Sequence, residues 1–332
     1  MLLKAQFFLF FILLIPNLYS DSFTIMNLNA QNLFDTLDDE GKDDKAFLPL
    51  ESKKSSEHIN SCHNINVKSW RMECLYLDWN EETKEAKLAN LVQNIISYEE
   101  KGADIIALQE IENENILEQL FNLLKPYGYI DFVLLEGTDK RGVDTAFISR
   151  IKMSNPKLHY VNFSPQFEKK DTRPILEVSI LFNDQNVRLY NVHFPSNFND
   201  LQMRIESFDL LKELHVAHSD ASIALGDFNL NSKDDRRKSV YKNQEDQWYV
   251  AHREGCQSCK GSYYYGYGKS WDFLDTIFVS RDRGIAFDKE SINVLKTDFN
   301  TYKDSGKPHR FDPKTKKGVS DHFPMVARIN LN

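Results

Sequence analysis

The chain contains short apolar runs that end abruptly in polar residues, and residues 221–231 show this pattern most clearly. Residues 223–225 have the composition of a buried strand, and Gly226 follows, where the backbone can turn. Asp227 and Asn229 come next, two positions apart, so on extended backbone their side chains would point to the same side. The pattern predicts a strand end that presents a carboxylate and an amide together. The alternative is an ordinary polar turn after a strand.

Other strand-like runs also carry polar residues at one end: Asn29, Glu110, His193, Asp275, Asp321 and His322. Segments with helical periodicity, such as residues 82–98, separate the strands, and this alternation favours a layered α/β fold with its site on strand-end loops. Each residue also has a simpler explanation when taken alone. Asn29 suits a turn, Glu110 a salt bridge, and His193 a structural role in a core. No serine elbow, P-loop or dinucleotide fingerprint competes with this set.

Length and composition are those of an ordinary globular protein: 332 residues, 41% hydrophobic and 27% charged, with a net charge of −8. This charge does not indicate a nucleic-acid binder, although a local basic patch can lie on an acidic protein. The densest basic stretch is residues 303–317, and residues 261–268 hold clustered tyrosines. Those tyrosines could stack on bases or form a packed hairpin rim. We expect residues 21–332 to form one domain and a monomer.

The first twenty residues have the features of a secretory signal peptide. Lys4 gives a positive start, residues 7–15 are apolar, and Ser20 precedes Asp21 as the expected mature start. The apolar run is too short for a comfortable membrane span, although an uncleaved anchor is the alternative. No second long apolar run follows, so we expect a secreted or periplasmic protein without a membrane anchor after cleavage.

Four cysteines, Cys62, Cys74, Cys256 and Cys259, fit an exported and oxidised protein. Their spacing suggests two local disulfides, Cys62–Cys74 and Cys256–Cys259, although sequence alone allows three connectivities. A four-thiolate zinc site normally needs two close pairs, and Cys62 and Cys74 are too far apart to make one. A redox pair at Cys256 would need a strand–helix context that is missing there.

Residues 36–80 form a long polar stretch that begins with several aspartates. A calcium loop is conceivable there, but the spacing of the acidic residues does not match one, so we expect a solvated insertion. The stretch contains Trp70, Tyr76 and Trp79, which favours an insertion that is folded down onto the protein rather than loose.

Seven motifs in order resemble those of the endonuclease/exonuclease/phosphatase superfamily, which includes deoxyribonuclease-like enzymes. They are Asn29-Ala-Gln-Asn-Leu-Phe, Ala-Leu-Gln-Glu110, Arg141-Gly-Val-Asp, Asn-Val-His193, Gly-Asp227-Phe-Asn229, Leu-Asp275-Thr-Ile-Phe-Val-Ser and Ser-Asp321-His322-Phe-Pro. The resemblance covers nearly all of the mature chain. It implies a four-layer α/β sandwich, with two mixed β-sheets packed face to face and flanked by helices. It also implies a divalent cation, usually Mg²⁺ and sometimes Mn²⁺ or Ca²⁺.

The resemblance also implies which residues would bind the metal and the phosphate. Glu110 would bind the cation with Asn29 beside it, and Asp321 would lie near the metal. Arg141 would meet a phosphate oxygen, and Asn29 and Asn229 would also contact the phosphate. Oxygen ligands of this kind suit a hard cation.

The remaining residues would carry the hydrolysis itself. Asp227 and Asn229 would hold and activate the attacking water, and His322, oriented by Asp275, would contact the scissile phosphate. His193 occupies the place where deoxyribonuclease-like members carry a histidine acid. An imidazole can donate or accept a proton near neutral pH.

The superfamily cuts DNA, RNA, phosphoinositides and sphingomyelin, so the fold does not settle the substrate. Export, the basic stretch, the tyrosine cluster and His193 favour an endonuclease that hydrolyses DNA, with RNA open as a second substrate. A phosphatase or a sphingomyelinase-like phospholipid phosphodiesterase is the alternative. A non-catalytic binding module is disfavoured because such a protein should have lost some of the polar residues.

Overall fold

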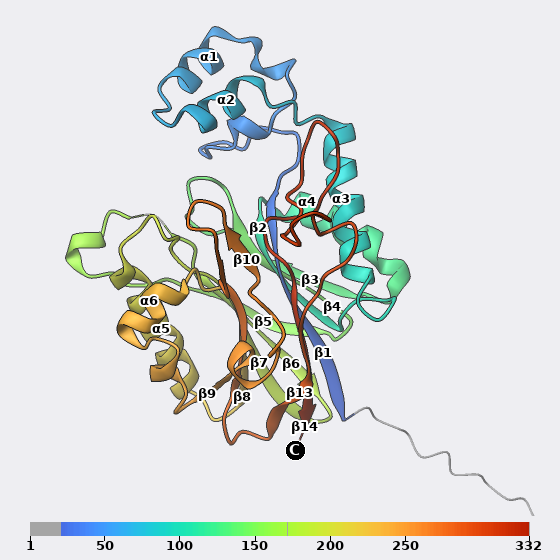
Figure 1. The fold of residues 1–332 in the computed structure, drawn as a ribbon, viewed down its shortest axis with the longest axis vertical. Coiled ribbons are helices and arrows are strands. Elements are labelled where there is room, and N and C mark those ends of the chain that lie inside the picture. Colours follow the sequence, from blue (N-terminus) through green and yellow to red (C-terminus); the bar gives the residue numbers. More distant parts are fainter. Residues whose placement is uncertain (1–20, 171, 332) are drawn as a thin grey trace, which may run out of the picture.

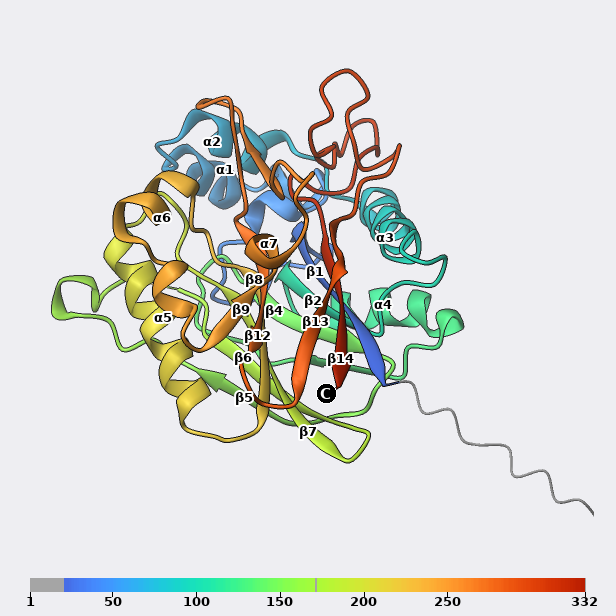
Figure 2. The ribbon, with the colours of Figure 1, turned by 60° about the horizontal axis from the view of Figure 1, so that its bottom comes forward.

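The protein is described here from a computed structural model covering residues 21–170 and 172–331. The predicted signal peptide, residues 1–20, lies outside the described residues. Two six-stranded mixed sheets pack face to face (Figures 1 and 2). The first has the order β13 (Ile285–Val294), β14 (Met325–Leu331), β1 (Ser22–Leu33), β2 (Ile105–Ile111), β4 (Asp144–Ser149) and β3 (Asp131–Leu134). The second has the order β5 (Met153–His159), β6 (Ile175–Phe182), β7 (Gln185–His193), β8 (Ala221–Asp227), β12 (Asp275–Ser280) and β9 (Trp248–Val250).

Each sheet is mixed because one pair of strands runs parallel. In the first sheet β1 is parallel to β2, and in the second β7 is parallel to β8. Alternate residues of a strand face opposite sides. Ile25 of β1 therefore joins the core between the two sheets, whereas its neighbour Met26 faces the helices.

Helices cover the outer face of each sheet. α3 (Glu81–Ile96) and α4 (Glu114–Leu124) bury their apolar sides on the first sheet, and α5 (Leu201–Val216) covers the second. The side chains of Asn80, Asn113 and Asp200 cap the three helix starts by accepting hydrogen bonds from backbone N–H groups. The order of layers is helix, sheet, sheet, helix, so the predicted four-layer α/β sandwich is confirmed.

The polar stretch after β1 forms a small lobe that projects from the sandwich (Figure 1). This α1–α2 lobe, residues 45–76, contains η1 (Lys45–Phe47), η2 (Ser52–Lys54), α1 (Ser56–His63) and α2 (Lys68–Tyr76). A Cys62–Cys74 disulfide joins its two helices. The insertion was expected to fold down onto the protein, and of its three aromatics Trp79 is buried whereas Trp70 and Tyr76 are 57% and 63% exposed.

Short elements fill the connections between the larger ones. They are η3 (Lys125–Tyr127), η4 (Pro165–Phe167), α6 (Ser232–Lys238), η5 (Lys242–Gln244), α7 (Ala251–Glu254) and the β10–β11 hairpin (Tyr263–Tyr265 and Ser270–Asp272). The second disulfide, Cys256–Cys259, follows α7, so both predicted cysteine pairs are found bonded. No helix in the described part of the chain combines the length and apolarity that crossing a membrane requires.

Candidate active site

Three neighbouring strands of the second sheet place polar side chains at the same level. His193 at the end of β7 lies opposite Asp227 at the end of β8, and Asp227 lies opposite Asp275 at the start of β12. All three side chains are buried. Because the strands are hydrogen-bonded neighbours, the register of the sheet, rather than a flexible loop, fixes the positions of these three residues relative to one another.

Gly226 and Asn229 differ from their predicted geometry. The strand does not end at Gly226 but continues through Asp227. A Cβ atom on Gly226 would lie 1.9 Å from the Val192 carbonyl oxygen, so glycine allows β7 to approach closely. Asn229 is not extended but has a φ of 50°. It is held beside Asp227 because its N–H donates to the Asp227 Oδ1 at 2.9 Å and its amide donates to the Phe194 carbonyl.

Asp275 and His322 form a buried pair. The Nδ1 of His322 lies 2.6 Å from the Oδ2 of Asp275, which also accepts a hydrogen bond from the Ser262 hydroxyl at 2.7 Å. Although burial opposes a charged ring, the charge and hydrogen bond of Asp275, helped by Asp227 and Asp321, raise the pKa of His322 well above its usual value. The ring is therefore held as an imidazolium with a fixed orientation.

The first sheet contributes Asn29 and Glu110 from across the interface between the sheets. The Asn29 amide donates to the Oε1 of Glu110 at 3.4 Å and to the Oδ2 of Asp227 at 3.2 Å. Glu110 has a φ of 63°, an unusual conformation for this residue type that is found where function requires it. Its Oε2 accepts a hydrogen bond from the backbone of Asn32 at 3.0 Å. One amide thus joins carboxylates from both sheets.

The His193 ring lies between these carboxylates. Its Nε2 is 3.8 Å from the Oδ2 of Asp227 and 3.9 Å from the Oε1 of Glu110, and its Nδ1 is buried without a hydrogen-bond partner. Burial lowers the pKa of His193 well below its usual value, and the positive charges of Arg173 and Arg141 lower it further. The ring is therefore neutral near pH 7.

Asp321 and Arg141 lie at the more open side of the site. The Oδ1 of Asp321 is 4.0 Å from the Nε2 of His322, and about a third of its side chain is exposed. The guanidinium of Arg141 donates to the side chain of Asn32 at 2.7 Å, and Asn32 in turn holds Glu110. The predicted residues are thus brought together, with Arg141 linked through Asn32.

Four further residues support this group and were not predicted from the sequence. The Asn27 amide donates to the Oδ1 of Asp275 at 3.3 Å, and the ring of Tyr263, 4.8 Å from that of His322, covers the imidazole. Lys87 of α3 is fully buried and donates to the Val319 carbonyl at 2.6 Å. Burial lowers its pKa to about 7, opposed by the charges of Asp321 and Glu110. The sequence could have pointed to Lys87 by its position four residues before Leu91, on the apolar face of the helix.

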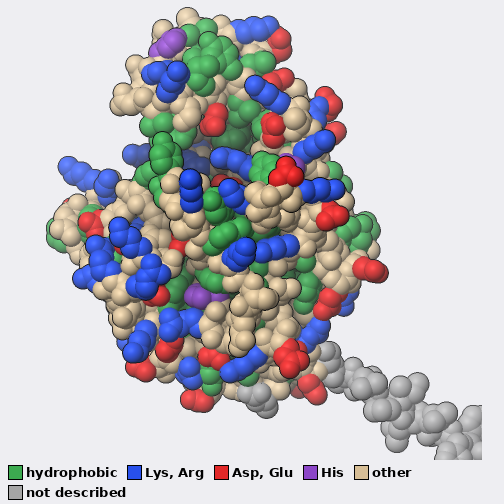
Figure 3. All heavy atoms as spheres, viewed as in Figure 1, with side chains coloured by type: hydrophobic (Ala, Val, Ile, Leu, Met, Phe, Trp, Pro, Cys, Tyr) green, Lys and Arg blue, Asp and Glu red, His purple; other side chains and the backbone are tan. Residues whose placement is uncertain are grey.

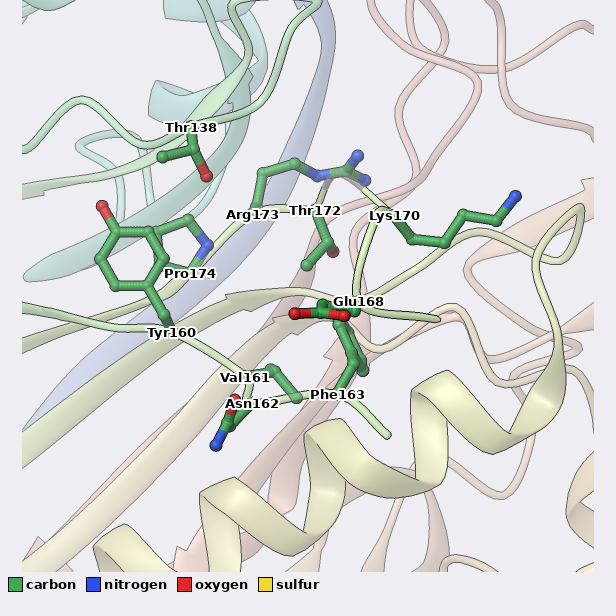
Figure 4. A pocket seen from close by; sticks show the side chains of 10 residues that line it. All are labelled: Thr138, Tyr160, Val161, Asn162, Phe163, Glu168, Lys170, Thr172, Arg173 and Pro174. Carbon is green, nitrogen blue, oxygen red and sulfur yellow. The ribbon is translucent and has the colours of Figure 1, made fainter. Parts of the chain in front are cut away.

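The fourth unpredicted residue, Arg173, borders a surface pocket beside the site. Its guanidinium pairs with Asp139 at 3.1 Å, and its positive charge acts on His193. Figure 4 shows the pocket, whose wall also includes Thr172, Lys170 and Tyr160. Two cationic side chains, Arg173 and Lys170, therefore line this hollow.

The acidic groups at the site are arranged so that a divalent cation could bind. Among the described residues, Glu110 and Asp321 have no lysine or arginine within 4 Å, and their ion-pair neighbours are histidines. The oxygens of Asp227, Asp275 and a nitrogen of His322 lie within 4.8 Å of one another, but Asp275 and His322 already share a hydrogen bond. Glu110 and Asp321 are therefore the better candidates for a hard cation, whereas the amide oxygen of Asn29 already accepts a hydrogen bond from the backbone of Gln31 at 2.9 Å.

Comparisons with known proteins agree with this geometry. Residues 75–331 match the model of the Endonuclease/Exonuclease/phosphatase family, whereas no curated protein sequence matches significantly. The solved structures with this fold include D. rerio TDP2 complexed with single strand DNA product, with 16% identity, a TM-score of 0.58, and coverage of 93% of this chain and 99% of that one. The mannosyl-6-phosphatase Bt3783 of Bacteroides thetaiotaomicron matches with 15% identity, a TM-score of 0.53, and coverage of 93% and 99%.

The human Nocturnin catalytic domain, solved with a bound sulfate anion, matches with 16% identity, a TM-score of 0.56, and coverage of 94% of this chain and 95% of that one. Identities this low establish the fold alone. The family match spans most of the described residues, from α2 to β14. The chain therefore belongs to the endonuclease/exonuclease/phosphatase family, whose members are generally phosphoester hydrolases.

Proposed function

We propose that this chain is an exported, divalent-metal-dependent phosphodiesterase that cleaves DNA as an endonuclease, with RNA as a second substrate. The observation that carries the proposal is the meeting of Asp227 with Asn29 and His193, beside the Asp275–His322 pair. A phosphodiester needs an oriented water, a neutralised phosphoryl group and support for the leaving oxygen. This group of side chains offers a candidate for each requirement.

Asp227 would take the proton of the attacking water, which Asn229 would help to orient. Burial raises the pKa of Asp227 to about 7, and the neighbouring charge of Asp275 adds to the rise, so the carboxylate is a useful base near neutral pH. The imidazolium of His322, oriented by Asp275, would stabilise the negative charge on a phosphoryl oxygen. These roles use the protonation states that the surroundings of the two residues favour.

Glu110 and Asp321 would hold the cation, Mg²⁺ in the first place and Mn²⁺ or Ca²⁺ as substitutes, and Asn29 would position Glu110 through its amide. When bound, the ion would neutralise charge on the phosphoryl oxygens. Arg141 would contact a phosphate oxygen at the open side. Because His193 is neutral, we propose that it donates a hydrogen bond through its Nε2 instead of acting as the proton donor that the resemblance implies.

Several features support a nucleic-acid substrate. The positive charges of Arg141 and Arg173 act on His193, and that of Arg310 acts on Tyr263. Lys307 lies 3.9 Å from the ring centroid of Tyr264, so the tyrosine hairpin is joined to the basic stretch. Figure 3 shows Lys and Arg side chains across the middle of this face, beneath the α1–α2 lobe. A chain of phosphates would find cationic partners near the cleavage point.

The test is nicking of supercoiled plasmid by the purified, oxidised protein with Mg²⁺, with and without a chelator. Asp227→Ala and His322→Ala should each lose at least about 100-fold in rate while keeping the fold. His63→Ala, at an exposed histidine of the lobe, is the matched control and should retain full activity. If either site variant stays near full activity, the role assigned to that residue is wrong.

A second candidate is a phosphatase or a phospholipid phosphodiesterase on the same fold. The solved mannosyl-6-phosphatase favours it, because that protein shares this architecture. Parallel assays on a sugar phosphate, inositol phosphates and sphingomyelin would separate the candidates. Turnover of one of these without plasmid nicking would replace the nuclease proposal, and inertness towards every substrate would leave a non-catalytic module.

A further inference from the structure

A second group of buried carboxylates lies outside the candidate active site. Asp39 and Asp44 come from the loop between β1 and the lobe, and Glu112 lies between β2 and α4. One carboxylate oxygen of each residue lies within 4.8 Å of the others. Asp44 and Glu112 are only 1% and 3% exposed. The group therefore joins two segments that are distant in the sequence, and this explains why the acidic spacing within the loop did not match a calcium motif.

Two oxygen atoms in this group are buried without any hydrogen-bond partner. They are the Oδ1 of Asp44 and the Oε1 of Glu112. The second oxygen of each carboxylate is occupied, since Asp44 Oδ2 accepts from the backbone of Asp39 at 2.8 Å and Glu112 Oε2 accepts from the backbone of Asp35 at 2.6 Å. A buried carboxylate oxygen without a donor is costly unless a cation or a proton satisfies it.

The positive side chains near the loop point elsewhere. Among the ion pairs of the described residues, none involves Asp39, Asp44 or Glu112. Lys42 donates to the carbonyls of Gly137 and Asp139 instead. These three carboxyl groups therefore have no lysine, arginine or histidine partner among the described residues.

The surrounding contacts hold the carboxylates in place. The Asn113 amide donates to the Oδ2 of Asp39 at 3.1 Å, while its side-chain oxygen caps α4. The backbone N–H of Glu112 donates to the Leu33 carbonyl at 3.0 Å. Ligands that are themselves hydrogen-bonded are characteristic of built metal sites.

We propose that Asp39, Asp44 and Glu112 bind a structural Ca²⁺ ion that is separate from the catalytic cation. Carboxylates on an irregular loop suit Ca²⁺, which accepts six to eight oxygens in flexible geometry, whereas Mg²⁺ demands a near-ideal octahedron. Backbone carbonyls and water would complete the shell. The ion fixes the loop that leads into the α1–α2 lobe to the end of β2, next to Glu110.

The competing explanation is that the carboxylates retain protons. Burial raises the pKa of Glu112 to about 9 and that of Asp44 to about 6, so without a cation a neutral Glu112 acid could donate a hydrogen bond within the group. The two explanations predict different responses to Ca²⁺. If the carboxyl groups retain their protons, Ca²⁺ has no effect on stability, whereas a bound cation displaces the protons and stabilises the fold.

The test is thermal unfolding of the full, oxidised, chelator-treated protein with and without Ca²⁺, together with calorimetric titration by Ca²⁺. At about 100 times the dissociation constant, binding should raise the unfolding midpoint by roughly 5 °C. Glu110→Gln should keep this rise because the catalytic site is not required. Asp44→Asn placed in the Glu110→Gln protein, where Ca²⁺ cannot use the catalytic site, should abolish it. Glu40→Gln, at an exposed acid of the same loop, is the matched control and should also keep the rise.

If Asp44→Asn does not fold, Asp39→Asn at the half-buried ligand replaces it. In calcium-free buffer the Asp44→Asn protein should be at least as stable as the wild type, because a repulsive charge is removed. The proposal fails if Ca²⁺ does not shift the wild-type midpoint, or if Glu110→Gln rather than Asp44→Asn removes the shift. It also fails if Asp44→Asn lowers stability equally with and without Ca²⁺.

Discussion

Replacing Asp275 by asparagine tests whether His322 works as an oriented, charged ring. The carboxylate is fully buried and accepts from Ser262, from Asn27 and at 2.6 Å from the imidazole. An amide of nearly the same shape would keep the packing but remove the charge. It would also present an N–H group or a weaker acceptor to the ring.

The expected loss follows from the contacts that change. A hydrogen bond to a charged group contributes about 1.5–3 kcal/mol, and each 1.4 kcal/mol corresponds to a tenfold change in rate. Losing this bond alone predicts roughly a 10- to 150-fold decrease. A misoriented ring adds to it, so we expect kcat/KM of Asp275→Asn to fall about 10²- to 10³-fold. Ser262→Ala removes a second hydrogen bond to the same carboxylate but leaves the charge that orients His322, so it should cost less, about fivefold.

The assay is the pH dependence of kcat/KM on the preferred substrate, with thermal unfolding to confirm the fold. Without the Asp275 charge, burial lowers the pKa of His322, so the imidazolium survives only at lower pH. The alkaline side of the activity profile should therefore move to lower pH in Asp275→Asn. A variant within threefold of the wild type at pH 8, or one with an unshifted alkaline side, would refute the reasoning.

Other substitutions test the scaffold. Although burial favours the neutral acid, hydrogen bonds from His159 and Arg188 hold the pKa of Glu177 below its usual value. The charged Glu177 therefore stabilises the folded protein above about pH 4.5, and this stabilisation is lost as the pH falls through the lowered pKa. Glu177→Gln should cost about 3 kcal/mol at pH 7 and flatten the acid side of a stability–pH curve; an unchanged curve counts against the pair. Gly226→Ala should destabilise the protein by at least about 3 kcal/mol in denaturant unfolding, because its Cβ would meet the Val192 carbonyl, whereas Gly266→Ala has open space and should not. Replacing Cys62 and Cys74 by serine should cost about 3 kcal/mol and open the lobe to proteolysis, and equal protease resistance would contradict this.

The architecture was predictable from periodicity and motif order, but the edges of the sheets were not. β5 carries Pro156 and mostly exposed residues, so it lacks the alternation that reveals a half-buried strand. β13 was also missed, since its alternation breaks at a bulge between Asp288 and Asn293. The apolar strands β2, β8 and β14 gave a clear signal because both of their faces are covered.

The candidate site was predictable where a residue itself ends a strand, as with Asp227 and His193. Residues whose influence depends on the tertiary structure gave no such signal: Ser262 donates to Asp275 from a loop, and the positive charge of Arg173 acts on His193 through space. The protonation state of His193 could likewise be inferred only from the structure. Only burial and the nearby arginines show that its ring is neutral, and sequence position cannot reveal either.

The division of the polar residues between the two sheets has a mechanical consequence. Asn29 and Glu110 belong to one sheet, whereas Asp227 belongs to the other, and the apolar core between the sheets fixes their spacing. A sliding movement of one sheet over the other by even one ångström would separate the base from the cation ligands without breaking either ladder. Trimming a buried side chain of that core, such as Phe147, should therefore impair turnover before it unfolds the protein.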